Sequence, residues 1–158
     1  MIEQDEKFMR RAIELAQNGI DANDGGPFGA VVVKDGRIVA EGWNQVTSTN
    51  DPTAHAEIVA IRKACAELNS FQLEGCTVYT SCEPCPMCLG AIYWARPERM
   101  LFACTREDAA RVGFDDEMIY EELQADFPAR RIKTINFMRE EGFSVFENWA
   151  KKADKTEY

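Results

Sequence analysis

Long apolar segments are missing from this 158-residue sequence. No run approaches the roughly 20 residues that a helix needs to span a bilayer. The N-terminal residues Met1–Glu6 are acidic and lack the apolar stretch of a signal peptide. Internal repeats, low-complexity tracts and Pro/Ser-rich linkers are also absent. We therefore expect a cytoplasmic protein that makes no membrane contact and forms one domain over residues 1–158.

Positive charge is scarce, since 18 lysines and arginines stand against 27 aspartates and glutamates, for a net charge of −9. Because phosphate contacts dominate affinity for polynucleotides, this balance disfavours nucleic acid as a partner. Apolar residues make up 46% of the chain and charged residues 28%, an ordinary globular mixture. This composition excludes a disordered chain, a collagen and a coiled coil.

Histidine and cysteine are also few. His55 is the sole histidine, and six cysteines are too few for the disulfide framework of a small secreted domain. Three of the six, Cys82, Cys85 and Cys88, fall within seven residues. Such clustering indicates metal binding or redox chemistry.

Hydrophobic periodicity predicts an α/β fold. Helices are expected at 3–18, 53–68, from Ser81–Glu83 to Ala95 and at 143–152, and strands at 28–33, 37–43, 76–80 and 99–104. Asp35 and Gly36 supply the turn of a hairpin between the first two strands. The strand–helix–strand order from residue 76 implies a crossover and a parallel pair of strands. We expect three layers, with a mixed sheet between helices.

The chemistry is concentrated in two short motifs at predicted helix starts, a His-x-Glu and a Pro-Cys-x-x-Cys. Cys85 and Cys88 share a helix face, and a helix N-terminus stabilises thiolates. Together with His55 they can hold Zn²⁺ and leave its fourth position to water, as in catalytic zinc sites. Glu57, two residues after His55, can act there as a general acid and base.

Two alternatives explain part of this pattern. In a closed structural zinc site, Cys82 or Cys104 would supply a fourth protein ligand. A redox pair would use Cys85 and Cys88 alone, but it leaves the His-x-Glu motif unexplained. Prolines on both sides of Cys85 stiffen the turn, and the sequence has no second Cys-x-x-Cys motif. The two motifs together favour a catalytic zinc site.

Taken together, His-x-Glu followed by Pro-Cys-x-x-Cys is the signature of zinc-dependent nucleobase deaminases. On these motifs the sequence resembles the cytidine deaminase-like zinc superfamily, and within it the bacterial guanine deaminases. The similarity covers nearly the whole chain and is most specific in the stretches Gly25–Ala30, Asn50–Glu57, Thr80–Ala95, Gly113–Asp116 and Lys155–Tyr158. The last two stretches point to guanine.

The resemblance implies a three-layer α/β/α fold with a mixed sheet of about five strands, and a homodimer. It also implies one zinc ion in each subunit, bound by His55, Cys85, Cys88 and a water molecule. In guanine deaminases of this kind the C-terminal segment, here residues 140–158, exchanges between subunits. Tyr158 would then line the pocket of the other subunit.

The implied reaction is the hydrolytic deamination of guanine to xanthine and ammonia, in purine catabolism or salvage. Water activated by the zinc attacks C2 of the base, Glu57 moves its proton, and Asp116 handles a second proton. Contacts to the base would come from the ring of Phe28, the Asn44 side chain at the O6/N7 edge, the backbone N–H of Ala56, the wall formed by Trp94 and the cap formed by Tyr158.

Each substrate contact has an alternative without a function. Phe28 and Trp94 can be core aromatics, and Asn44 can bond its own backbone in a loop. A C-terminal residue such as Tyr158 is usually frayed. Asp115 and Asp116 can cap the helix that follows them. From the residues alone the cap is favoured, and the choice of Asp116 over Asp115 rests on the resemblance.

Three other functions share parts of the pattern. A tRNA adenosine deaminase has the same zinc motifs but needs a basic surface for its RNA, which this chain lacks overall. A deaminase of another small base, such as cytosine, adenine or an aminotriazine, also fits. A structural zinc module without turnover is disfavoured by the open fourth position and by Glu57.

Overall fold

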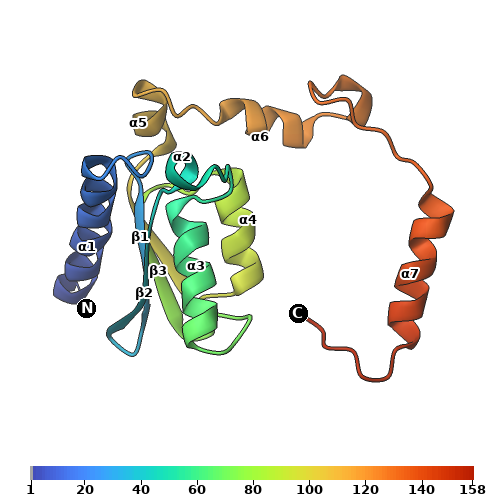
Figure 1. Cartoon of the computed structure of the whole chain (residues 1–158), viewed down its shortest axis with the longest axis horizontal. Helices are drawn as coiled ribbons and strands as arrows, with labels where there is room; N and C mark the ends of the chain where they lie inside the picture. The colour runs from blue at the N-terminus through green and yellow to red at the C-terminus, as the bar shows by residue number, and fades with distance from the viewer. Residues whose placement is uncertain (1) are drawn as a thin grey trace. The chain divides into compact units, whose positions relative to one another are not determined.

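The computed structural model describes residues 2–158, which form two compact units divided between Asp116 and Glu117. The first unit holds the whole sheet. Its elements are α1 (Ile2–Asp21), β1 (Gly29–Lys34), β2 (Arg37–Trp43), α2 (Val46–Thr49), α3 (Ala56–Glu67), β3 (Cys76–Cys82), α4 (Pro86–Ala95), β4 (Arg99–Cys104) and α5 (Arg106–Arg111) (Figure 1). The second unit holds α6 (Glu117–Gln124), the short 3₁₀ helix η1 (Phe127–Ala129) and α7 (Arg139–Lys151).

The sheet is mixed, with strand order β2-β1-β3-β4. β1 runs antiparallel to both β2 and β3, and β3 runs parallel to β4. The predicted hairpin and the predicted parallel pair are both confirmed. None of the helices formed by residues 2–158 is both long and apolar enough to cross a membrane.

The expected count of five strands is wrong, because the described residues form four. After β4 the chain forms α5, α6 and α7. The β-prone segment 131–137 between the last two helices joins no sheet, and Ile135 and Phe137 on it are exposed. A β-prone sequence becomes a strand only when a neighbouring edge is available for pairing.

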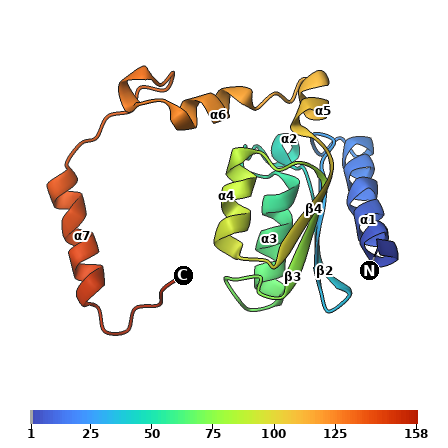
Figure 2. The same cartoon turned by 180° about the vertical axis from the view of Figure 1, so that it is seen from behind.

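The three predicted layers are present in the first unit. Figures 1 and 2 show α1 against one face of the sheet and α3 with α4 against the other. On the α1 face the core includes Phe8, Leu15, Val31, Val33 and Tyr79. On the opposite face it includes Val32, Ala60, Ala64, Leu73 and Val78.

Helix α3 packs very closely on β2 at Gly42. A Cβ atom on Gly42 would lie 2.3 Å from the main-chain oxygen of Ala56 and 2.6 Å from the nitrogen of Ala60. Contacts this short leave room only for glycine. The first turn of α3, which follows His55, is therefore seated directly on the sheet.

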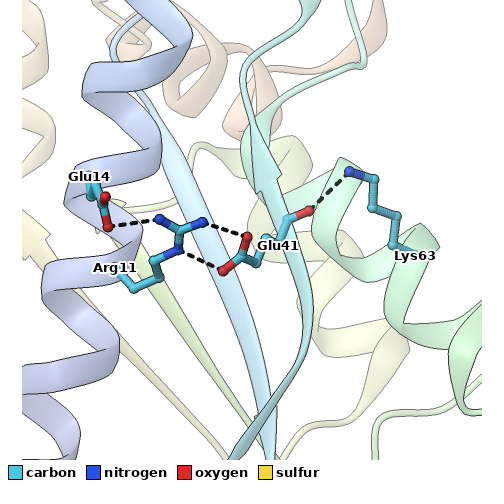
Figure 3. A network of polar contacts seen from close by, with 4 residues as sticks. All are labelled: Arg11, Glu14, Glu41 and Lys63. Atoms are coloured by element: carbon cyan, nitrogen blue, oxygen red, sulfur yellow. Dashed lines mark hydrogen bonds and ion pairs between the residues drawn. The ribbon is translucent and has the colours of Figure 1, made fainter.

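Charged side chains tie both helical layers to β2, which lies at one end of the sheet (Figure 3). Arg11 of α1 donates two hydrogen bonds to Glu41, at 2.7 and 2.9 Å, and a third to Glu14. Lys63 of α3 donates to the main-chain oxygen of Glu41 at 3.1 Å. The hydrogen bonds from Arg11 lower the pKa of the Glu41 carboxyl. Charges along an edge strand also oppose edge-to-edge aggregation.

Candidate metal centre

Two helix N-termini carry the predicted metal ligands. His55 is the N-cap residue of α3 and Cys85 is the N-cap residue of α4, both with extended backbone. Cys88 is the third residue of α4, one turn after Cys85. Because the N-terminal end of a helix favours negative charge, this position suits thiolates.

Both helices begin later than their sequence patterns predict. The expected starts were Thr53 and Ser81–Glu83, whereas α3 begins at Ala56 and α4 at Pro86. Proline favours the first helical position, so Pro86 fixes the start of α4. Pairing of Cys82 with Cys104 extends β3 two residues beyond its expected end.

The three predicted ligands meet in space. Nδ1 of His55 lies 3.5 Å from Sγ of Cys85 and 3.4 Å from Sγ of Cys88. Tetrahedral zinc, with bonds of about 2.0 Å to nitrogen and 2.3 Å to sulfur, separates such ligand atoms by about 3.5 Å. The residues present therefore fit a zinc ion without rearrangement.

The ligand group has three members among residues 2–158, with their ligand atoms within 4.8 Å of one another. Neither Cys82 nor Cys104 belongs to it, so the structure gives no support to a closed four-ligand site. Cys88 is buried, while His55 and Cys85 are half-buried. Three ligands on a partly open site match the arrangement of catalytic zinc, which keeps one position for water.

The pKa shifts of the three residues agree with this interpretation. A hydrogen bond from Cys88 lowers the pKa of Cys85 to about 4, despite the opposing effect of burial. The same hydrogen bond raises the pKa of Cys88, and the contact with Cys85 raises the pKa of His55. The protein surroundings thus favour the thiolate form of Cys85. Two thiolates and a neutral imidazole form a ligand set well suited to zinc.

Glu57 lies beside the ligands without joining their group. It is the second residue of α3 and only 5% exposed. Its Oε2 atom lies 3.4 Å from Sγ of Cys88, and its Oε1 atom lies 3.3 Å from Oγ1 of Thr80. Burial raises the pKa of the Glu57 carboxyl, a property expected of a general acid and base. The sequence interpretation did not single out Thr80; its only signal was a polar residue in a buried strand.

Phe28 and the Gly113–Asp116 stretch come together in the first unit. The rings of Phe28 and Phe114 meet edge to face, with centroids 5.0 Å apart. Asp116 is half-buried, and its pKa is raised by burial and by the nearby charge of Cys85. The fold therefore brings one of the two stretches that pointed to guanine close to a metal ligand.

Asn44 is buried and fixed in orientation. Its Oδ1 atom accepts hydrogen bonds from the backbone N–H groups of Gly26, at 3.2 Å, and Val46, at 3.1 Å. A Cβ atom on Gly25 would lie 2.2 Å from that oxygen. Asn44 does bond the local backbone, as the alternative interpretation held, and within residues 2–158 it does so through its oxygen. The amide nitrogen, with two donors, is the part of the group left for another partner.

The other predicted contacts lie in different surroundings. Ala56 is fully buried at the start of α3. Trp94 on α4 is 63% exposed, so it is not a core aromatic. Tyr158 ends the second unit and is 71% exposed.

Comparison with known families gives one match of direct relevance to the site. Residues 2–104 match the family described as the cytidine and deoxycytidylate deaminase zinc-binding region. The matched range includes all three ligands and Glu57.

Individual proteins similar to this chain differ in sequence identity and in the share of the chain that they match. Guanine deaminase from Bacillus subtilis is 55% identical over 97% of this chain and 98% of its own, and its crystal structure superposes with a TM-score of 0.94. A guanine deaminase structure from Nitrosomonas europaea is 36% identical, covers 69% of this chain and 63% of its own, and gives a TM-score of 0.66. A tRNA-specific adenosine deaminase from Haemophilus influenzae is 42% identical over 71% of this chain and 68% of its own.

Proposed function

The chain belongs to the cytidine and deoxycytidylate deaminase family of zinc-binding proteins, and on this basis we propose that it hydrolyses guanine to xanthine and ammonia. One observation carries the choice of substrate. Identity with the Bacillus subtilis guanine deaminase is 55% and spans 97% of the chain, including the second unit. The tRNA deaminase from Haemophilus influenzae is less similar and matches 71%. An acidic chain also suits a small base better than an RNA.

In this proposal His55, Cys85 and Cys88 would hold a zinc ion. The zinc would act as a Lewis acid that activates water near neutral pH. Glu57 accepts a proton from the attacking water and delivers it to N3 of guanine, while the water oxygen bonds to C2. Asp116 helps to carry the second proton to the departing amine. The C2–N bond then breaks, and ammonia and xanthine are released.

Asn44 accounts for selection of an oxo-purine. Its oxygen accepts hydrogen bonds from two backbone donors, so its amide nitrogen would be the group that donates to the substrate. The O6 and N7 atoms of guanine are both hydrogen-bond acceptors and match that donor group, whereas adenine presents an amino group at C6. The Phe28 ring would lie against the base, and the Ala56 N–H and Trp94 would complete the contacts.

Exposed apolar residues on the C-terminal helix α7 are the reason that we also propose a homodimer in which the C-terminal segments are exchanged. Phe143, Phe146 and Trp149 recur at helical spacing on α7 and are 48%, 69% and 42% exposed. Exposed apolar side chains grouped in this way usually mark a protein interface. We expect a second copy of the chain to cover them, and residues 140–158 to bring Tyr158 to the partner's site.

A cytoplasmic role in purine metabolism fits the ligand chemistry. All six cysteines are free, and two of them must stay reduced to bind zinc. Reducing conditions of that kind prevail in the cytosol.

Ammonia release tests the proposal directly. The zinc-loaded protein is given guanine, adenine, cytosine, a diaminotriazine and an anticodon hairpin at matched concentrations. We expect dominant release from guanine. Dominant release from the hairpin would replace the proposal with tRNA deamination, and release from none would favour a structural zinc module.

A further inference from the structure

Thr80 is a buried polar side chain that the proposed reaction leaves without a role. It is 1% exposed and lies near the end of β3, paired with Ala30 of β1 and Phe102 of β4. A hydroxyl so deeply buried must find hydrogen-bond partners, because leaving it unpaired is costly. The identity of those partners indicates what Thr80 does.

Two acceptors lie within reach of the Thr80 hydroxyl. The Oε1 atom of Glu57 is 3.3 Å away, and the main-chain oxygen of Cys82 is 3.0 Å away. A hydroxyl has one proton, so its rotation decides which acceptor receives it. An ionised carboxylate is the stronger acceptor of the two.

The two oxygens of Glu57 therefore have different neighbours. Oε2 faces Sγ of Cys88, a proposed metal ligand, and Oε1 faces Thr80 on the sheet. As a ligand, Cys88 is a thiolate and has no proton to donate to Oε2. The hydrogen bond from Thr80 then restrains the Glu57 carboxylate on the side away from Cys88. Because the two oxygens belong to one planar group, fixing Oε1 also fixes the position of Oε2.

We propose that Thr80 is a positioning residue that holds Oε1 of Glu57, so that Oε2 faces the reacting water. The inference rests on the proposed deaminase function but not on guanine as the substrate. Proton transfer needs its donor and acceptor within hydrogen-bond reach, so a carboxylate free to rotate transfers protons less often.

The test replaces the hydroxyl while keeping the shape of the side chain. Thr80→Val removes it, Thr80→Ser restores it, and Thr80→Ala serves if the valine variant does not fold. Thr77→Val is the matched control on the same strand, because Thr77 is bonded to Arg99 and not to Glu57. We measure kcat and KM on whichever base the wild type deaminates fastest, the visible spectrum of the cobalt-loaded proteins, and crystal structures of the zinc-loaded proteins.

We expect Thr80→Val to lower kcat by about tenfold to a hundredfold, the range for losing a hydrogen bond to a charged group. KM should change less than about threefold, since ground-state binding is untouched. Thr80→Ser should recover most of kcat, and Thr77→Val should match the wild type. The thiolate-to-cobalt absorption should be unchanged, and the Glu57 carboxylate should be rotated or split between conformers in the valine structure.

Other results would overturn the inference. An unchanged kcat, or a Glu57 carboxylate that stays in place without the hydroxyl, would show that Thr80 does not position it. An altered cobalt spectrum would show that Thr80 acts through the Cys82 carbonyl and the ligand loop instead. Absence of guanine turnover in the wild type would refute the proposed substrate, whereas the crystallographic comparison would still decide the role of Thr80.

Discussion

Glu57 and Cys88 approach each other to 3.4 Å, between Oε2 and Sγ, although 31 positions separate them in the chain. The Cys88 thiol donates this hydrogen bond, and its pKa is raised. As a metal ligand Cys88 would instead be a thiolate, and a carboxylate beside a thiolate needs a cation nearby. The pair therefore makes sense as the rim of a metal site, with one member binding the metal and the other handling protons. The two roles can be separated by mutation.

Glu57→Gln should abolish turnover while sparing the metal. The amide keeps the size of the side chain but cannot accept and return a proton, and general acid–base catalysis contributes about 10²–10⁴-fold to rate. We expect kcat to fall at least about 10²-fold, with zinc still bound at one ion per chain by elemental analysis. Glu67→Gln, at the exposed end of the same helix, is the control. Near-normal turnover in the Glu57 variant would remove this residue from the mechanism.

Gly42→Ala should weaken both the fold and the metal site. Its Cβ would meet the main-chain oxygen of Ala56 at 2.3 Å, so α3 must move away from the sheet and carry His55 with it. Overpacking of this kind costs about 1–3 kcal/mol in the free energy of unfolding. Denaturant unfolding and zinc retention against a chelator measure the two effects. Gly90→Ala, where an added Cβ meets nothing within 4 Å, should leave both unchanged or slightly improved.

The Arg11–Glu41 pair predicts a pH-dependent contribution to stability. Arg11 lowers the pKa of Glu41 in the folded state, so the folded protein holds the ionised form more strongly than the unfolded chain does. The stabilisation is therefore present above the unfolded pKa of about 4.3 and is lost as the pH falls through the lower folded pKa. Both side chains are about one-third exposed, which limits the effect to about 0.5–1 kcal/mol.

Unfolding free energies of the wild type and Glu41→Gln, measured between pH 3 and 8, test this expectation. The difference should be constant near neutral pH and should shrink below about pH 4. Glu14→Gln is the control, because Glu14 contacts the same arginine from a more exposed position. A difference that grows as the pH falls would contradict the assigned sign.

The metal ligands could be predicted from sequence because their geometry is local. His55 and Glu57 share the start of one helix, and Cys85 and Cys88 share the start of another. Spacing along a helix fixes which side chains lie together, so each motif carries its own geometry. The three-layer order and the parallel pair followed from strand and helix periodicity in the same way.

Features that depend on partners in space could not be predicted. Whether segment 131–137 forms a strand depends on an edge to pair with, which its own composition does not reveal. Thr80 reaches Glu57 only through the packing of α3 on the sheet. The orientation of Asn44 depends on two backbone donors, one of them in the Gly25–Gly26 turn. Helices α3 and α4 begin three or more residues later than expected, because their extended cap residues, His55 and Cys85, do not interrupt the periodic pattern.

Asn44→Asp should change which purines are accepted. Aspartate keeps an oxygen for the N–H groups of Gly26 and Val46, so the loop is retained, but it replaces the donors that we propose for substrate binding with an acceptor. A site that loses a matched hydrogen bond discriminates strongly against its former substrate. We expect kcat/KM for guanine to fall at least about tenfold relative to 2,6-diaminopurine, which presents an amino group at C6. Asn69→Asp, the same change in an exposed turn, should leave the ratio unchanged. An equal fall in kcat/KM for both purines would show that Asn44 supports the loop and does not discriminate between the bases.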